Sequence, residues 1–162
     1  MGRIQVSWRP IYIKGGKEMI KETVTYEDFN GNTHTEELHF NMTEFELTEF
    51  AMELPEDLAD SVKPDASPAE IMTVVVSKLG RKGIVDFIKR LVIASFGVKS
   101  EDGLSFIKNE KIATQFANSM AFHTFVMELI SNDDASAKFF NGIIPAKLAA
   151  KIPAELQGPT NN

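Results

Sequence analysis

The chain has 162 residues, of which 43% are apolar, so it is long enough to bury the core of one domain and too apolar for general disorder. It contains no cysteine, which excludes disulfides and thiolate metal sites and agrees with a reducing cytoplasm. The net charge of −6 disfavours contact with the phosphates of nucleic acid, and no apolar run approaches the roughly 18 residues of a membrane span.

The charges divide the chain into three parts. Residues 1–21 hold five basic groups and one acidic group, for a charge of +4. Residues 22–60 hold twelve acidic groups and no lysine or arginine, and residues 61–162 hold twelve basic and ten acidic groups. A solvated face is the simpler interpretation of the acidic part, and a surface that attracts a basic partner or repels other copies is the alternative.

Residues 1–18 are predicted to form a basic arm or a strand. Ile4, Val6 and Trp8 alternate with polar residues, which is the pattern of a short strand, and Gly15-Gly16 is a joint before the next element.

Residues 19–28 and 33–40 are predicted to form a β-hairpin around Asn30-Gly31. A loop of three residues, 29–31, is preferred, because it places the apolar strand residues on one face, whereas a two-residue loop at Asn30-Gly31 would split them between two faces. Gly31 would then take the left-handed position of the loop. The residues expected on the shared face, which should pack on the helices, are Ile20, Val24, Tyr26, Leu38 and Phe40.

The next helix is predicted to run from residue 41 to about Leu54, before Pro55. Its start has two candidate capping boxes, Asn41 with Glu44 and Thr43 with Glu46, and the sequence leaves both open. Residues 55–66 are expected to be a polar loop.

Four further helices complete the predicted bundle. The first begins at Ser67-Pro68 and ends at Gly80, and the second covers residues 84–96. The third covers 109–130, with Asn109 as its N-cap and a break near Ser119 left open; the fourth covers 133–141. A last short helix is expected from Pro145.

Gly97 and Gly142 each follow an apolar helical run, so both are expected to end a helix with positive φ. The polar residues 99–103 are expected to form a turn between helices.

The predicted fold is therefore α+β and mainly α, with the hairpin, alone or with one extra strand, packed on about five helices. Residues 19–150 are expected to form one domain, with the hairpin in 19–40 and the helical part in 41–150, and residues 151–162 a flexible tail.

A search for catalytic, cofactor-binding or metal-binding residues gives none. His34 and His39 have opposite parity on one strand and so point to opposite faces, which does not suit a shared metal. His123 lies among apolar residues of a helix and is interpreted as packing. Asp28, Asn30 and Asn32 resemble the start of a calcium loop but are better explained as a tight turn.

An excess of apolar residues in the last helices is the remaining functional signal. The chain has 12 Phe and 7 Met, and Phe- and Met-rich helices form adaptable surfaces for other helices. A generous core is the alternative explanation. The residues proposed to bind a partner are Phe122, Phe125, Met127, Phe139, Phe140, Ile143 and Ile144.

Three blocks of sequence, in order, carry a resemblance to a known family. They read LHFNMTEFEL (38–47), SFGVKSEDG followed by FIKN (95–109), and FVMELISNDDASAKFFNGIIP (125–145). Together with the hairpin they resemble the tail assembly chaperone family of long-tailed bacteriophages, over about residues 20 to 148. Met1–Lys17 and the basic glycine pair Gly80–Gly83 depart from the usual pattern of that family.

The resemblance implies a non-enzymatic late viral protein without cofactor. Its implied partner is the phage tape measure protein, which it would keep soluble in the host cytoplasm until the tail tube polymerises around it. It also implies self-association, or association with a frameshift-extended form, and absence from the mature virion. The alternative is a tube or tail-completion protein that is retained in the virion.

Overall fold

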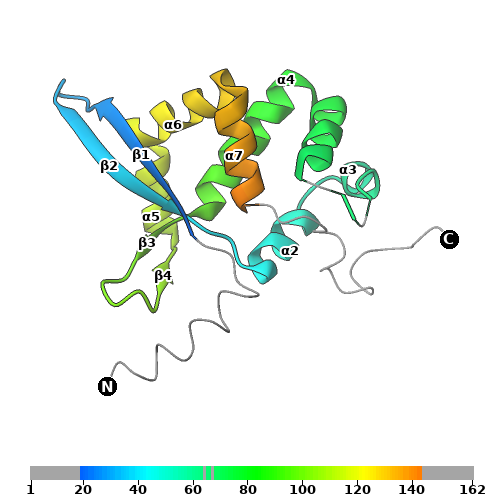
Figure 1. Cartoon of the computed structure of the whole chain (residues 1–162), viewed down its shortest axis with the longest axis horizontal. Helices are drawn as coiled ribbons and strands as arrows, with labels where there is room; N and C mark the ends of the chain where they lie inside the picture. The colour runs from blue at the N-terminus through cyan, green and yellow to red at the C-terminus, as the bar shows by residue number, and fades with distance from the viewer. Residues whose placement is uncertain (1–18, 64, 67, 144–162) are drawn as a thin grey trace.

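The computed structural model of the chain describes residues 19–63, 65–66 and 68–143. Its elements, in chain order, are β1 (Ile20–Glu27), β2 (Thr33–Phe40), α2 (Glu44–Met52), α3 (Glu56–Asp60), α4 (Pro68–Ser95), β3 (Phe96–Lys99), β4 (Phe106–Ile107), α5 (Glu110–Ala117), α6 (Met120–Ser131) and α7 (Asp133–Ile143). The fold is α+β and mainly α, as predicted (Figure 1). The expected arm strand, the Ser67 cap, the helix from Pro145 and the tail from residue 151 lie outside the described residues.

The β1–β2 hairpin has the predicted register. Ile20 pairs with Phe40 and Tyr26 pairs with His34, so residues of even number share one face of the hairpin. That face carries all five of the predicted apolar residues, and its base is buried. The parity argument from the sequence is confirmed.

The hairpin turn is the predicted three-residue loop. The N–H of Asp28 donates to the carbonyl of Asn32 at 2.8 Å, and the N–H of Gly31 donates to the carbonyl of Asp28 at 3.0 Å. Gly31 has a φ of +84°, in the region that favours glycine. The carboxylate of Asp28 also accepts from the backbone N–H groups of Asn30 and Asn32, so a polar side chain stabilises the turn.

The sheet has four strands in the order β1-β2-β3-β4, all antiparallel. The polar turn expected around residues 99–103 is present, with the N–H of Gly103 donating to the carbonyl of Ser100 at 3.0 Å, but it joins strands β3 and β4 and not two helices, so the expected neighbours of the turn are wrong. The reason is long-range: Phe96 directly follows α4 and pairs with Phe40 at the end of β2, where a strand edge is free. In Figure 1 the β3–β4 hairpin lies beside the base of the longer hairpin.

The expectation of positive φ at Gly97 and Gly142 is also wrong, since the described glycines with positive φ are Gly31, Gly80 and Gly103. Both positions instead need a residue without a side chain. A Cβ on Gly97 would lie 2.7 Å from Cε2 of Phe106, and a Cβ on Gly142 would meet the side chain of Ile20. Close approach, and not a left-handed backbone, explains these two glycines.

The helices begin and end close to their predicted positions. Gly80, with a φ of 68°, divides α4 into the two predicted helices. Thr43 and Glu46 form the capping box of α2, which decides between the two candidates. Asn109 caps α5 as predicted, and Ser119 caps α6, so the helix is broken at the point that the sequence left open. The short helix α3 lies where a loop was expected, because Leu58 is buried in the core.

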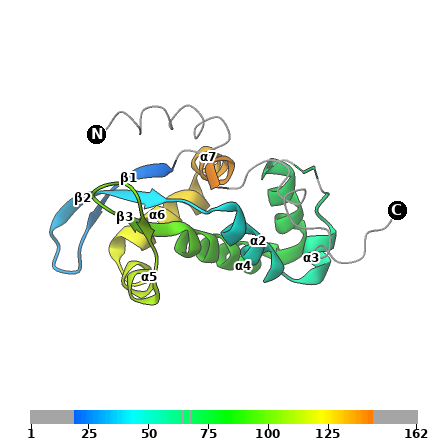
Figure 2. The ribbon, with the colours of Figure 1, turned by 90° about the horizontal axis from the view of Figure 1, so that it is seen from below.

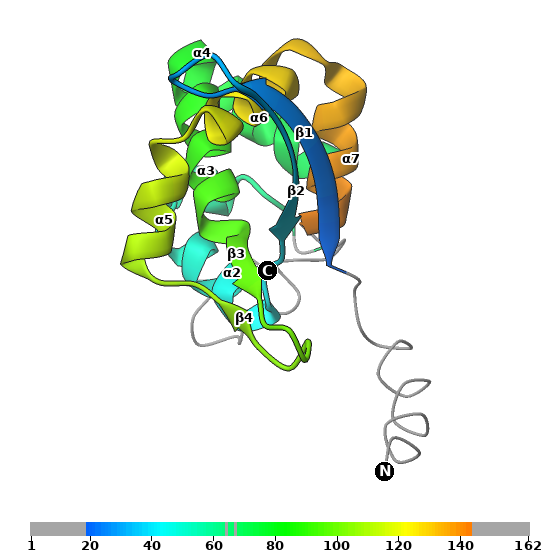
Figure 3. The same ribbon diagram turned by 90° about the vertical axis from the view of Figure 1, so that its left-hand side faces the viewer.

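The helices cover the apolar face of the hairpin. Helices α6 and α7 both contact β1, and α4 contacts α5, α6 and α7. Figure 3 shows α6 and α7 beside the hairpin, and Figure 2 shows its turn end projecting beyond the helices. The core between these layers therefore joins the base of the hairpin to the C-terminal helices.

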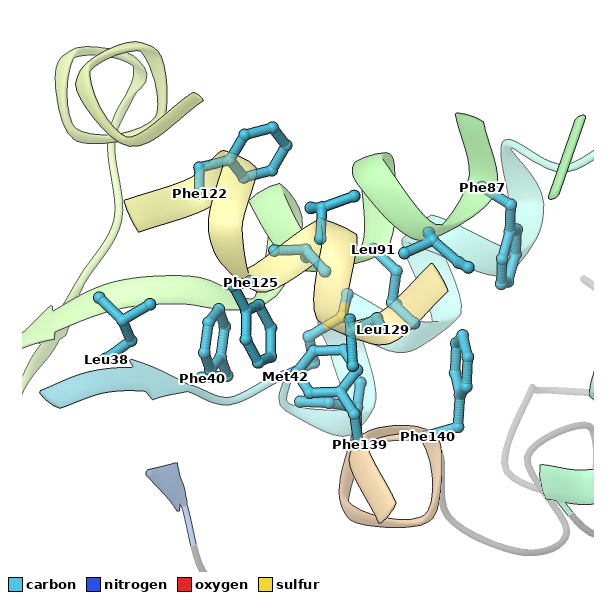
Figure 4. Packing of buried hydrophobic residues seen from close by; sticks show 14 of the residues in the cluster. Leu38, Phe40, Met42, Phe87, Leu91, Phe122, Phe125, Leu129, Phe139 and Phe140 are labelled. Atoms are coloured by element: carbon cyan, nitrogen blue, oxygen red, sulfur yellow. The ribbon is translucent and has the colours of Figure 1, made fainter. Parts of the chain in front are cut away.

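Phe40 is the centre of this core (Figure 4). Its fully buried ring stacks on Phe125 of α6 at 4.9 Å between centroids and meets the edge of Phe139 of α7 at 5.3 Å. It also contacts the rings of Phe96 and Phe116. One side chain of β2 thus holds together β3, α5, α6 and α7.

Candidate partner-binding surface

Five of the seven predicted partner-binding residues lie in the core and not on the surface. They are Phe122, Phe125, Phe139, Phe140 and Ile143, each with no more than 3% of its area exposed. Figure 4 shows Phe125 and Phe139 beside Phe40 of the hairpin, and Phe140 facing Phe87 of α4. Phe122 points away from the hairpin and contacts Phe116 of α5. Their assignment to a partner-binding surface assumed that these five side chains are exposed, and the structure buries them instead. Met127 lies on the surface, and Ile144 lies outside the described residues.

The outer side of α6 carries an apolar stripe. Met127 is 59% exposed and Ile130 is 40% exposed, and exposed His123 precedes them on the same side of the helix. Spacings of four and three residues place the three side chains on one face. The Nδ1 of His123 lies 2.8 Å from the carbonyl of Ser119, so the ring is held against the start of the helix. We call Met127 and Ile130, with His123 at the edge, the α6 stripe.

A second exposed apolar group lies on the β3–β4 hairpin, and the sequence analysis missed it. Val98 pairs with Ile107 across the two strands, and both are more than two-fifths exposed. Leu104, in the turn between them, is 83% exposed. The alternation of Phe96 with Val98 was a usable signal, but two short strands are too brief to be recognised without their partner strand.

Lys108 holds the β3–β4 hairpin against the start of α2. Its Nζ donates to the carbonyl of Asn41 at 2.7 Å and to Oε1 of Glu46 at 2.9 Å. Partial burial raises the pKa of Glu46, but hydrogen bonds from the Thr43 N–H and from Lys108 outweigh it and leave that pKa lowered. Glu46 is thus held ionised while it caps α2, which gives the β3–β4 hairpin a fixed position.

The hairpin turn contains a second polar side-chain contact. The Nε2 of His34 lies 2.6 Å from Oδ2 of Asp28. This contact, together with the N–H groups of Asn32 and Asn30, lowers the pKa of Asp28 to about 2. His39 contacts Glu37 instead, on the opposite face, so the two strand histidines are separated as predicted.

The described residues offer little for chemistry. None of their His, Asp and Glu side chains gather in a group of three that could hold a metal ion. Ser95 is fully buried and its hydroxyl donates to the carbonyl of Leu91 at 2.7 Å, which is a structural role. Among the same residues, no helix has the length and apolar character to cross a membrane.

Comparison with known proteins gives one finding. Neither the curated proteins nor the solved structures contain a match to this chain. A family model described as phage tail assembly chaperone matches residues 19–161, which is 143 of the 162 residues. That family suggests a non-enzymatic role. The chain therefore belongs to the phage tail assembly chaperone family.

Proposed function

We propose that the chain binds the phage tape measure protein and keeps it soluble until the tail tube polymerises around it. Membership of the family indicates the process, which is assembly of the phage tail. The α6 stripe is the observation that supports the proposed mode of binding. Exposed apolar side chains at helical spacing fit the apolar stripe of another helix. Met127 is well suited to this contact because an unbranched thioether adapts to different neighbours.

The binding needs neither nucleotide nor metal in this proposal. Each copy contacts the exposed tape measure chain weakly, many copies together keep it soluble, and tube subunits displace them by mass action. The exposed acidic side chains of the hairpin and α2, in a stretch that has no lysine or arginine from residue 22 to 60, remain in solvent and limit aggregation of the complex.

The mode of binding is tested by aspartate substitutions in the α6 stripe. Met127→Asp and Ile130→Asp place a charge on exposed positions, so both proteins should fold with unchanged circular dichroism. Their ability to hold co-expressed tape measure protein in the soluble fraction should fall, because loss of an interface anchor costs about 2 kcal/mol or more per contact. Phe29→Asp is the matched control, since Phe29 is 76% exposed on the distant hairpin turn.

Solubilisation equal to that of the unmodified chain in both stripe variants would show that the α6 stripe is not the binding surface. Asp variants of Phe122 or Phe139 do not serve this test, because those side chains are buried and their loss unfolds the core.

We also propose that the protein acts in the cytoplasm of the infected host and is absent from the finished particle. Mass spectrometry of lysates and of purified virions tests this directly. Abundance in the lysate with absence from virions is the expected result. Stoichiometric presence in virions would favour a retained tube or completion protein.

A further inference from the structure

Strand β1 has a free outer edge. It is the first strand in the sheet order β1-β2-β3-β4, so β2 is its one neighbour among the described strands. Figure 2 shows β1 as the outermost strand, on the side of the sheet away from β3. Helix α7 lies against Ile20 at one end of β1, and the edge from Lys21 to Glu27 has no partner strand in the described part of the chain. Such an edge is a template for a further strand.

The odd-numbered residues of β1 direct their backbone N–H and C=O groups to this outer edge. The N–H of Asp28 donates to the carbonyl of Asn32, so these two residues form a hydrogen-bonded pair that continues the β1–β2 ladder. Hydrogen-bonded pairs recur at every second residue, and the even-numbered residues of β1 therefore bond to β2. The residues whose backbone groups point away from β2 are Lys21, Thr23, Thr25 and Glu27.

The solvent-facing side of β1 carries a positive charge near one end and a negative charge near the other. Lys21 and Glu27 are both exposed, and neither forms an ion pair with another described residue. They are six residues apart, about 20 Å along a strand, so they do not contact each other within one copy. An antiparallel strand with the same order of charges places a positive group opposite each negative one. A second copy of β1 has that order.

We infer that β1 pairs with β1 of a second copy, antiparallel and around a two-fold axis at Val24. Lys21 then lies opposite Glu27 of the second copy, and Thr23 lies opposite Thr25, and the axis repeats each of these pairs. The four outward-pointing residues of each copy form hydrogen-bonded pairs, which gives about eight backbone hydrogen bonds between the two strands. Opposite charges and facing threonines both stabilise an antiparallel pair.

The sequence of β1 favours this register over its neighbours. The outward-pointing residues of both copies must lie opposite one another, so odd-numbered residues pair with odd-numbered residues. An axis at Thr23 would place Lys21 opposite Thr25, and an axis at Thr25 would place Lys21 opposite Phe29. Both registers lose the contacts between opposite charges. The outer edge of β2 fits less well, because β3 already pairs with the last two residues of that strand.

The pairing joins two copies into one unit with a continuous sheet. Residues opposite each other in an antiparallel pair share a face, so the helices of both copies lie on the same side of the joined sheet. Helix α6 packs on β1 in each copy, and the unit therefore carries two α6 stripes. In the proposed function, two weak contacts on one unit increase the avidity for an apolar chain. The pairing of β1 itself does not rest on that function.

Charge reversal at Lys21 and Glu27 tests the pairing on the full chain alone. Lys21→Glu places two carboxylates opposite each other at both ends of the β1 pair, and Glu27→Lys places two ammonium groups there. In sedimentation equilibrium, each variant should have a dimer dissociation constant at least about tenfold above that of the unmodified chain. An equimolar mixture of the two variants again places opposite charges at both ends, so it should dimerise about as tightly as the unmodified chain. Lys111→Glu, at an exposed position of α5, is the control for the change in net charge.

A mass of 18.0 kDa for the unmodified chain at every concentration would overturn the inference, and so would a mixture of the folded variants that stays dissociated. A mass that grows beyond twice 18.0 kDa, in the unmodified chain and in both variants alike, would place self-association on another surface and refute the pairing of β1. Circular dichroism of the same samples establishes that each variant is folded. The tape measure protein is absent from this assay, so its result is independent of the proposed function.

Discussion

Replacing Phe40 by alanine tests the central packing of the fold. The ring is fully buried and contacts four other phenylalanines, on β3, α5, α6 and α7. Removal of a buried phenylalanine ring costs about 3–5 kcal/mol, which is a large part of the roughly 5–15 kcal/mol that stabilises a typical domain. At about 2–4 °C per kcal/mol, the melting temperature should fall by roughly 6–20 °C.

Urea unfolding followed by circular dichroism measures this loss as a lower midpoint with an unchanged slope. Phe29→Ala is the control, since it makes the same substitution at an exposed position of the same hairpin and should change stability by less than about 0.5 kcal/mol. A loss below about 1 kcal/mol for Phe40→Ala would refute the packing of the hairpin base on the helices.

Three further predictions concern local structure. Gly97→Ala should destabilise the protein by about 1 kcal/mol, because the added methyl group meets the ring of Phe106. The loss of stability should be smaller when Phe106 is also replaced by alanine. Equal losses with and without the Phe106 ring would contradict the steric explanation. Thr43→Ala should cost about 1 kcal/mol by removing the α2 cap, measured by thermal unfolding. Asp28 has a pKa of about 2 in the folded protein, below its unfolded value of about 3.9, so its contribution is present above the unfolded pKa and is lost as pH falls towards 2. The difference in urea midpoint between the unmodified protein and Asp28→Asn should therefore shrink between pH 6 and pH 2, and a constant difference would contradict this contact.

Local rules were enough to predict the hairpin and most helix ends. The parity of Tyr26 and Leu38 determined the register, because a strand has a period of two and one face must be apolar. Asn109 was recognised as a start signal because an N-cap side chain bonds to a backbone group only three residues away. The break near Ser119 was left open by the sequence, and Ser119 caps α6 in the same way. These features depend on interactions within a few residues of sequence.

Strands β3 and β4 could not be predicted in the same way. Phe96 and Gly97 adopt a strand only because the end of β2 offers them a partner more than fifty residues earlier in the chain. The same long-range pairing explains why Gly97 has an extended backbone where a helix-ending glycine was expected. At this position the pairing with β2 overrides the local conformational preference of the sequence.

The apolar excess in α6 and α7 was read as a surface because one apolar stripe is usual for a helix. Helix α6 contacts β1, α4, α5 and α7, so it is covered on several sides and needs more than one stripe. Phe122 and Phe125 therefore belong to the core, while Met127 remains on the outer side. A sequence pattern indicates how many faces are apolar, but only the packing shows which of them face solvent.

The most direct test of the proposed function is the solubility of the tape measure protein with and without this chain. The tape measure gene product is expressed alone, with the unmodified chain, and with the Met127→Asp, Ile130→Asp double variant, and its soluble fraction is measured after centrifugation. We expect it to be soluble only with the unmodified chain and to co-purify with it. Equal soluble fractions in the presence and absence of the unmodified chain would contradict the proposal that this protein keeps the tape measure protein soluble.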